Sequence, residues 1–138
     1  MTKNFLDIEN VTFAASAKSK VNNVSLTIEN EGDIICLLGP SGIGKTTILR
    51  TIAGLEKIQS GKIILKNKIL SSKDSHVEPE NRNISLAFQD NSLFPHYNVI
   101  QNIQFGADRN KKKEKSLTID EVIKFLHLEH IKEKFPHQ

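Results

Sequence analysis

The residues best suited to chemistry in this sequence form a glycine-rich run, Gly39-Pro40-Ser41-Gly42-Ile43-Gly44-Lys45-Thr46. The run fits the phosphate-binding pattern GxxxxGK[ST], in which glycines let backbone N–H groups curl around phosphate oxygens. The amino-terminal end of a following helix adds a partial positive charge. In such a loop Lys45 reaches the β- and γ-phosphates, and the Thr46 hydroxyl ligates Mg²⁺. The run therefore predicts a site for a nucleoside triphosphate with Mg²⁺.

The segments on either side of this run have the patterns that a phosphate-binding loop needs. A continuous apolar run, Ile34–Leu38, precedes it and predicts a strand buried on both faces, with Cys36 as a small core residue. The residues after the run have apolar side chains at helical spacing: Ile48, Leu49, Ile52, Ala53 and Leu55. The alternative is a glycine-rich turn without a ligand, and the combined pattern favours the phosphate site.

The rest of the chain separates into an α/β part and a helical part near residue 90. Apolar patterning predicts four further strands: 6–9, 24–29, 62–65 and 84–89. Helices are predicted over three stretches after residue 90, the second of which starts at a Thr118–Glu121 capping box: 99–103, 119–126 and 128–135. We therefore expect an ATP-binding core over 1–90 and a partial helical subdomain over 91–138.

The composition excludes several classes of protein. The chain has 138 residues, 38% hydrophobic and 25% charged, so a disordered or membrane-embedded class is not expected. A single cysteine excludes an internal disulfide framework. The net charge is +3, and five basic residues gather within residues 109–115. One short basic run is typical of a solvated loop or helix start, so no nucleic-acid partner is expected.

Two classes of phosphate-binding-loop protein fit less well. A GTPase needs an Asn-Lys-x-Asp base reader, and here Asn67-Lys68 is followed by Ile69-Leu70. A small-molecule kinase commonly has a lid with arginines, and the arginines of this chain are three: Arg50, Arg82 and Arg109. The residues around the glycine-rich run therefore decide the class.

Those residues resemble the ATP-binding cassette (ABC) family, the nucleotide-binding subunits of ABC transporters. The run continues through Thr47 into Leu49-Arg50-x-Ile52-Ala53-Gly54-Leu55, which is similar to the family's P-loop and helix. Ser60-Gly61 stands where the family has its "SG" turn. The Q-loop region of the family is similar to Leu86-Ala87-Phe88-Gln89-Asp90-x-x-Leu93-Phe94-Pro95-His96-x-x-Val99-x-x-Asn102-Ile103-x-x-Gly106. The likeness implies an ABC-type P-loop NTPase core, in which an antiparallel β part accompanies the P-loop strand and helix.

By this resemblance the cofactors are ATP and Mg²⁺. Phe13 stands where the family places an aromatic side chain that stacks on adenine. Gln89 stands where the family has a catalytic glutamine that contacts Mg²⁺, together with Thr46, and the attacking water. Without the resemblance, Gln89 is interpreted as a solvated polar residue and Phe13 as a core or edge residue. The implied nucleotide-binding residues are Phe13, Gly39, Pro40, Ser41, Gly42, Ile43, Gly44, Lys45, Thr46 and Thr47.

The resemblance also implies partners. Family members use an apolar stretch after the Q-loop to receive a short helix of a membrane-embedded permease subunit, and that stretch corresponds here to Leu93, Phe94, Pro95, Tyr97 and Val99. The alternative is that these side chains pack inside the helical part. A second ATP-binding subunit and, indirectly, a periplasmic solute-binding protein complete the expected assembly. Its expected place is the cytoplasmic face of a bacterial inner membrane.

The 138 residues lack several motifs of the family. Phe135-Pro136-His137-Gln138 looks like the lead-in to the Leu-Ser-Gly-Gly-Gln signature, and neither the signature nor the aspartate and glutamate that follow it occur in the sequence. We therefore expect the amino-terminal half of an ABC ATPase, inactive alone. The long connector Ser71–Asn81 is most similar to ferric-iron importers, so ferric iron is the expected cargo. The alternatives are a soluble ABC ATPase acting on nucleic acid or in translation, and a non-catalytic remnant.

Overall fold

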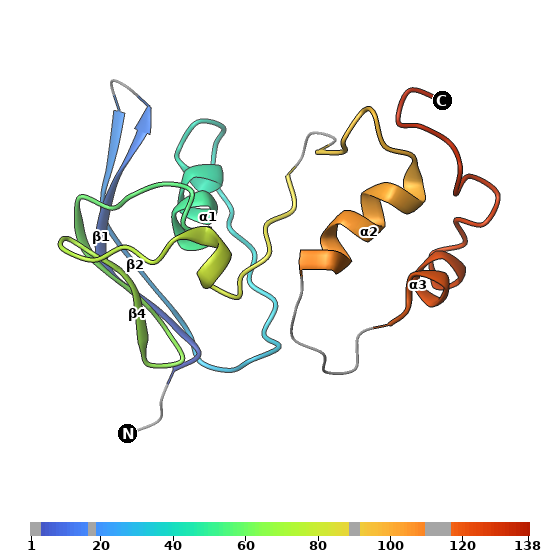
Figure 1. The fold of residues 1–138 in the computed structure, drawn as a ribbon. Helices are drawn as coiled ribbons and strands as arrows, with labels where there is room; N and C mark the ends of the chain where they lie inside the picture. Colours follow the sequence, from blue (N-terminus) through green and yellow to red (C-terminus); the bar gives the residue numbers. More distant parts are fainter. Residues whose placement is uncertain (1–3, 17–18, 89–91, 110–116) are drawn as a thin grey trace. The chain divides into compact units, whose positions relative to one another are not determined.

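The computed structural model describes residues 4–16, 19–88, 92–109 and 117–138. The chain forms two compact units, Met1–Ala87 and Phe88–Gln138 (Figure 1). The predicted division at residue 90 falls among residues 89–91, outside the described residues. The first unit holds the strands and the glycine-rich run, and the second is helical.

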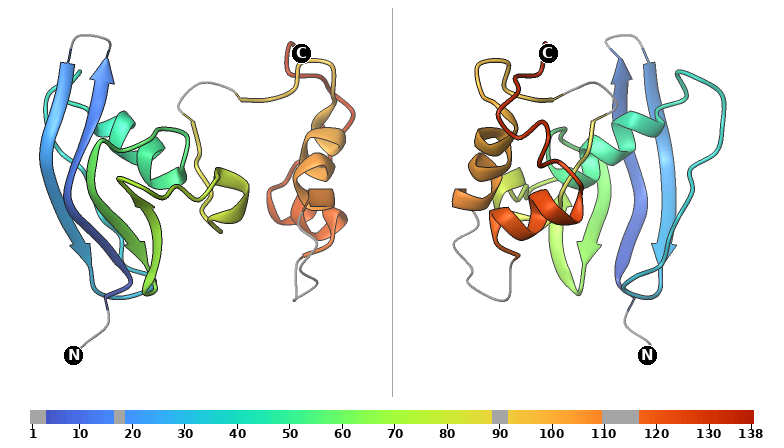
Figure 2. Two further views of the ribbon diagram at one scale, coloured as in Figure 1. Left: turned by 60° about the vertical axis from the view of Figure 1, so that its left-hand side comes forward. Right: turned by 90° about the vertical axis from the view of Figure 1, so that its right-hand side faces the viewer.

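A four-stranded antiparallel sheet forms the first unit. Its strands in spatial order are β2 (Ser19–Ile28), β1 (Leu6–Ser16), β3 (Ser60–Leu65) and β4 (Lys68–Ser72). Helix α1 (Lys45–Ala53) covers one face of this sheet (Figure 2). The strands predicted over 6–9, 24–29 and 62–65 correspond to β1, β2 and β3. Strand β4, and the short 3₁₀ helix η1 (Pro79–Asn81) after it, are additional to the predicted elements.

The apolar core of the first unit lies between the sheet and α1. The inward side chains of β1 are at most 6% exposed: Leu6, Ile8, Val11 and Phe13. The pairing register shifts between Ile8 and Val11, where Asn10 has a φ of 48°. This irregularity lets β1 point apolar side chains inward both before and after Asn10. The other elements complete the core with Ile48, Ile58, Ile63 and Leu70.

Two predicted strands are wrong within the described residues: 34–38, directly before the glycine-rich run, and the segment that begins at residue 84. Residues 34–38 belong to no strand, and the side chains of Ile34 and Leu38 are 97% and 88% exposed. Cys36 is also exposed and is not a core residue. Residues 84–88 likewise form no strand. A strand needs neighbours that pair with its backbone N–H and C=O groups, and neither segment pairs with any of the described strands.

The second unit contains α2 (Val99–Arg109) and α3 (Ile119–Phe125). The predicted capping box is confirmed: the Glu121 N–H donates to Thr118 Oγ1 at 3.2 Å, and the Thr118 N–H donates to Glu121 Oε2 at 2.7 Å. The helix predicted over 128–135 is wrong, because His127 adopts a φ of 55° after α3 and turns follow. No helix in the described ranges is long and apolar enough to cross a membrane.

Candidate nucleotide-binding site

The glycine-rich run forms a loop over residues 39–44 that leads directly into α1. Gly42 and Gly44 have φ angles of 81° and 104°, in the left-handed region that favours glycine. Space also restricts position 44, because a Cβ atom there would lie 2.9 Å from Val21 Cγ2. Nothing lies within 4 Å of a Cβ at Gly42, so the loop stays open on that side.

The loop and the start of α1 present unpaired hydrogen-bond donors. Within the described part of the chain, the backbone N–H groups of residues 41–44 have no protein acceptor. The first N–H groups of an α-helix also lack partners inside the helix and carry its partial positive charge. The first turn of α1 holds no acidic side chain that would neutralise them. These donors suit the oxygens of a phosphate group.

Lys45 folds back over this loop. Its Nζ donates to the carbonyl oxygens of Gly39 and Pro40, at 2.7 and 2.8 Å. An ammonium group has three donor hydrogens, so these bonds leave one for a further acceptor. The lysine charge is therefore held beside the backbone donors, where a phosphate would meet both. The residues present fit a nucleotide phosphate chain.

The other predicted loop residues lie around this cradle. Pro40 and Ser41 are exposed, and so is Thr46, whose hydroxyl belongs to the first turn of α1. Thr47 is half-buried, and its carbonyl oxygen accepts a hydrogen bond of 2.7 Å from Thr51 Oγ1. Ile43 is 54% exposed at the loop surface. The exposed hydroxyls leave room for Mg²⁺ at the start of the helix, whereas Gln89 lies outside the described residues.

Phe13 does not have the exposed ring that the stacking prediction requires. Its side chain is 1% exposed and belongs to the apolar core. Phe13 Cε2 would lie 3.5 Å from a Cβ at Gly44, so the ring packs directly beneath the glycine-rich loop. A base stacks on a ring face that solvent can reach. In this structure Phe13 therefore supports the loop from below and has no face free for adenine.

The sequence patterns do not identify the residues that hold the two ends of α1. Val21 of β2 lies beneath Gly44 at the amino-terminal end, and Arg82 lies against Gly54 at the carboxyl-terminal end. Val21 follows no motif, and Arg82 sits in a connector without periodicity. Gly54 itself is the one signal that the sequence offers, since a glycine directly after a helix commonly caps it, and its φ of 91° fits that role.

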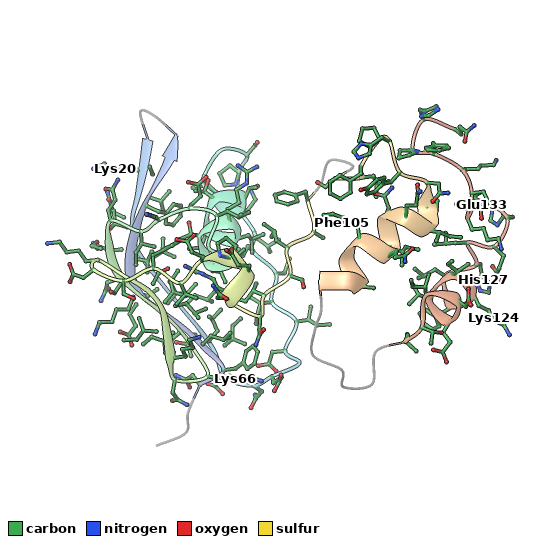
Figure 3. The ribbon with its side chains drawn as sticks, in the orientation of Figure 1. Lys20, Lys66, Phe105, Lys124, His127 and Glu133 are labelled. Carbon is green, nitrogen blue, oxygen red and sulfur yellow. The ribbon has the colours of Figure 1, made fainter. Side chains whose placement is uncertain are left out.

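The predicted docking stretch lies in the second unit and packs partly on α2. Phe105 of α2, labelled in Figure 3, lies 4.4 Å from the ring of Phe94 between centroids, and the rings of Phe94 and Tyr97 are 5.4 Å apart. Asn102 of α2 fixes the backbone of this loop, accepting from the Phe94 N–H at 2.8 Å and donating to the Tyr97 carbonyl at 3.0 Å. Leu93 remains 52% exposed. The stretch thus combines internal packing with an accessible apolar surface.

An apolar cavity of about 540 Å³ adjoins this stretch within the second unit. Leu93 and Val99 line one part of it, and Leu126 and Ile131 line another. Phe135 and Pro136, near the end of the sequence, close it further. The cavity is lined almost entirely by carbon, which suits apolar side chains rather than a nucleotide.

Comparison with known proteins decides the family. The profile described as ABC transporter matches residues 21–138. This chain belongs to the ABC transporter family. The match takes in the glycine-rich loop, α1 and both helices of the second unit, and it confirms the predicted family.

Named relatives of this ABC chain are import proteins for polyamines. The spermidine/putrescine import ATP-binding proteins PotA of Shigella dysenteriae serotype 1 and of Escherichia coli K12 are both 42% identical to it over 123 residues. That alignment covers 88% of this chain and 31% of each relative, so the chain spans less than a third of their length. The expected likeness to ferric-iron importers is not supported by these relatives.

Solved ABC cassettes share the fold of this chain. The cassette MJ0796 aligns with a TM-score of 0.72 at 23% identity, over 96% of this chain and 62% of that one. CbiO1 of Clostridium perfringens aligns with a TM-score of 0.69 at 28% identity, over 98% of this chain and 55% of that one. The predicted ABC-type P-loop NTPase core, with its antiparallel β part, is confirmed.

Proposed function

We propose that this ABC chain is the nucleotide-binding part of an import ATPase and that it binds MgATP at residues 39–47. The cradle carries this proposal: the N–H groups of residues 41–44 have no acceptor among the described residues, and two carbonyl oxygens fix the Lys45 ammonium beside them. Related cassettes support the choice of ligand, since MJ0796 has been solved with ADP and Pi. Residues 39–47 lie within a single unit of the fold.

The metal and catalytic roles form a second part of the proposal. The exposed Thr46 hydroxyl would hold Mg²⁺, which supplies charge neutralisation between the phosphates when it is bound. Gln89 would be a further ligand and would contact the attacking water. ABC ATPases hydrolyse ATP, and because the chain spans 31% of its relatives, hydrolysis by the whole protein is part of the proposal.

The proposed assembly joins this chain to membrane-embedded permease subunits, to a second ATP-binding subunit and, through the permease, to a periplasmic solute-binding protein. It would lie at the cytoplasmic face of a bacterial inner membrane. The support within the molecule is the stretch 93–99, which carries exposed Leu93 on a loop that Asn102 holds in shape. A preformed apolar loop docks at a lower cost in ordering entropy than a mobile one.

We propose polyamines as the cargo of the assembly, in place of ferric iron. The 42% identity to spermidine/putrescine import proteins supports this choice. The test is uptake of radiolabelled spermidine and of ferric iron by cells that lack this chain. Loss of spermidine uptake with ferric-iron uptake unchanged is the expected result, and the reverse pattern would overturn the choice.

Titration with a fluorescent ATP analogue in the presence of Mg²⁺ tests nucleotide binding. Lys45→Ala removes a charge-assisted contact to phosphate and should weaken affinity at least about tenfold. Lys124→Ala is the matched control, because it removes the same charge from an exposed position on α3 in the other unit. Equal affinity for the wild-type chain and Lys45→Ala would reject the site.

A further inference from the structure

Arg82 is a buried cation whose hydrogen bonds tie α1 to β4. Its side chain is 2% exposed. Nη1 donates to the Thr51 and Ile52 carbonyls at 3.1 and 2.9 Å, and Nη2 donates to the Leu70 carbonyl at 3.2 Å and to Ser71 Oγ at 2.7 Å. Thr51 and Ile52 lie in the last turn of α1, whereas Leu70 and Ser71 belong to β4. A single guanidinium group therefore spans the gap between the two elements.

The acceptors on α1 are carbonyls of its last turn, and the Thr51 carbonyl also accepts from the N–H of the cap residue Gly54 at 3.1 Å. The last four carbonyls of an α-helix have no partner inside the helix and carry its partial negative charge. Thr51 and Ile52 are two of these four in α1. A fixed cation at that end satisfies both carbonyls and the helix dipole. Burial lowers the pKa of Arg82, and the nearby carboxylate of Glu78 acts against this effect.

His76 provides a second connection between the same elements. Its Nδ1 lies 3.2 Å from Arg82 Nη2, and its Nε2 lies 3.1 Å from the Gly54 carbonyl oxygen. Arginine only donates, so the tautomer that fits both contacts has Nδ1 as an acceptor, which shares the two Nη2 hydrogens with the Leu70 carbonyl and Ser71 Oγ, and has the proton on Nε2, which donates to Gly54. The Arg82 Nε–H also donates to the Val77 carbonyl at 2.6 Å, which holds the connector against the same group.

The fit around Gly54 shows how closely Arg82 approaches the helix end. A Cβ atom at position 54 would overlap Arg82 Nε and would lie 2.9 Å from both Cδ and Cζ of that side chain. The other end of α1 has the same arrangement, with Gly44 against Val21. Helix α1 is thus held at both ends by close approaches that only glycine permits, and its amino-terminal end carries Lys45 and Thr46.

We propose that Arg82 is a positioning residue for the nucleotide site: by holding the carboxyl-terminal end of α1 on β4, it sets the place of Lys45 and Thr46 over the sheet. The proposal rests on the nucleotide-binding function proposed above. A helix of nine residues is about 13 Å long at ~1.5 Å per residue. Release of one end therefore tilts a short rigid rod and displaces the phosphate cradle at its other end.

Two variants of Arg82 and one control test this role in the 138-residue chain. Arg82→Gln removes the cation and most of its bonds, and Arg82→Lys keeps the charge. Leu6→Ala is the control, because it opens the same core at the start of β1 and lowers stability without removing any hydrogen bond of Arg82. Hydrogen exchange of the α1 amides and affinity for the fluorescent ATP analogue are measured well below each melting temperature.

Arg82→Gln should speed exchange in α1 relative to β1 and weaken nucleotide affinity about tenfold, with partial rescue in Arg82→Lys. Leu6→Ala should lower the melting temperature without either change. Unchanged α1 exchange and affinity in Arg82→Gln would overturn the proposal. If Arg82→Gln does not fold, His76→Ala replaces it, because it removes one connection between α1 and the connector. The same two quantities are measured in His76→Ala. Hydrogen exchange in α1 and nucleotide affinity equal to those of the wild-type chain would then overturn the proposal. A wild-type chain that binds no nucleotide rejects the proposed function instead, and the exchange measurement then decides the Arg82 role alone.

Discussion

Gly44 lies directly over the ring of Phe13: a Cβ atom at position 44 would be 3.5 Å from Phe13 Cε2. Val21 Cγ2 would be closer still, at 2.9 Å. The loop that is proposed to hold phosphates therefore rests on core side chains of β1 and β2. Core packing and ligand binding depend on the same contact. A mutation of the core side chains should therefore change nucleotide affinity, and a mutation of the loop should change stability.

Gly44→Ala should disturb the loop in two ways. The new methyl group meets Val21, and alanine disfavours the φ of 104°. Left-handed backbone costs a residue other than glycine about 1–3 kcal/mol. We expect a lower unfolding midpoint in urea and weaker nucleotide binding. Gly32→Ala is the control, because its φ of 97° is similarly unfavourable but nothing lies within 4 Å of its Cβ. Similar losses of affinity in both variants would contradict the contact argument.

Phe13 should act on stability and not on the choice of base. Phe13→Ala empties a buried site and should cost about 3–5 kcal/mol of unfolding free energy. Phe13→Leu retains most of the apolar volume and should preserve the ratio of ATP to GTP affinity, since the ring has no exposed face. Nucleotide competition assays on Phe13→Leu measure that ratio. A changed preference for adenine would restore the stacking role.

The capping box of α3 should respond to acid. The backbone N–H of Thr118, and next its hydroxyl, hold the pKa of Glu121 below its ordinary value. A carboxyl group whose pKa is lowered on folding stabilises the cap when the pH is above the pKa of the unfolded chain, about 4.3. This stabilisation is lost as the pH falls through the pKa of the folded chain. The Thr118 amide resonance should report that titration. Glu121→Gln should abolish it, whereas Asp120→Asn should leave it in place.

The 138-residue chain should show no ATP turnover above background. Hydrolysis needs an oriented water and charge stabilisation around the γ-phosphate. The sequence offers a phosphate cradle, but it has no carboxylate directly after an apolar strand beyond Gln89 to act as the base. Phosphate release is measured for the chain and for Lys45→Ala. Robust release from the wild-type chain that disappears in Lys45→Ala would refute this expectation.

The apolar segment 34–38, which is exposed except at the half-buried Leu37, should promote self-association. Ile34 and Leu38 are 97% and 88% exposed, and the segment has no strand partner among the described residues. Unpaired apolar segments favour intermolecular pairing. Ile34→Lys should reduce aggregation in light scattering while leaving the melting temperature of the first unit unchanged. Ile34 would instead be a structural residue if Ile34→Lys lowered the melting temperature.

The sequence predicted well what depends on local pattern. The capping box, the alternation in β1 and the glycine-rich run followed by a helix each follow from residues within a few positions of one another. The family also follows from local motifs, and the comparisons confirm it. Lys45 and Thr46 are therefore recognisable without a structure.

The errors arose where a residue depends on partners distant in sequence. Residues 34–38 have the composition of a buried strand, but no described strand pairs with them. Phe13 fits a stacking position by motif, yet the fold turns its ring inward. Arg82 has no local signal, because its acceptors come from residues 51–52 and 70–71. Pairing, burial and long-range hydrogen bonds are properties of the folded chain that periodicity does not encode.

The hydrogen bonds from Lys45 Nζ to the carbonyl oxygens of Gly39 and Pro40 affect the ligand selectivity of the loop. The ammonium keeps one donor hydrogen for an incoming molecule, and an anionic oxygen attracts that donor more strongly the more charge it carries. The affinity of the loop for a nucleotide should then increase with the negative charge of its phosphate chain. Triphosphates and diphosphates should displace one another, monophosphates should compete poorly, and uncharged nucleosides should not compete at all.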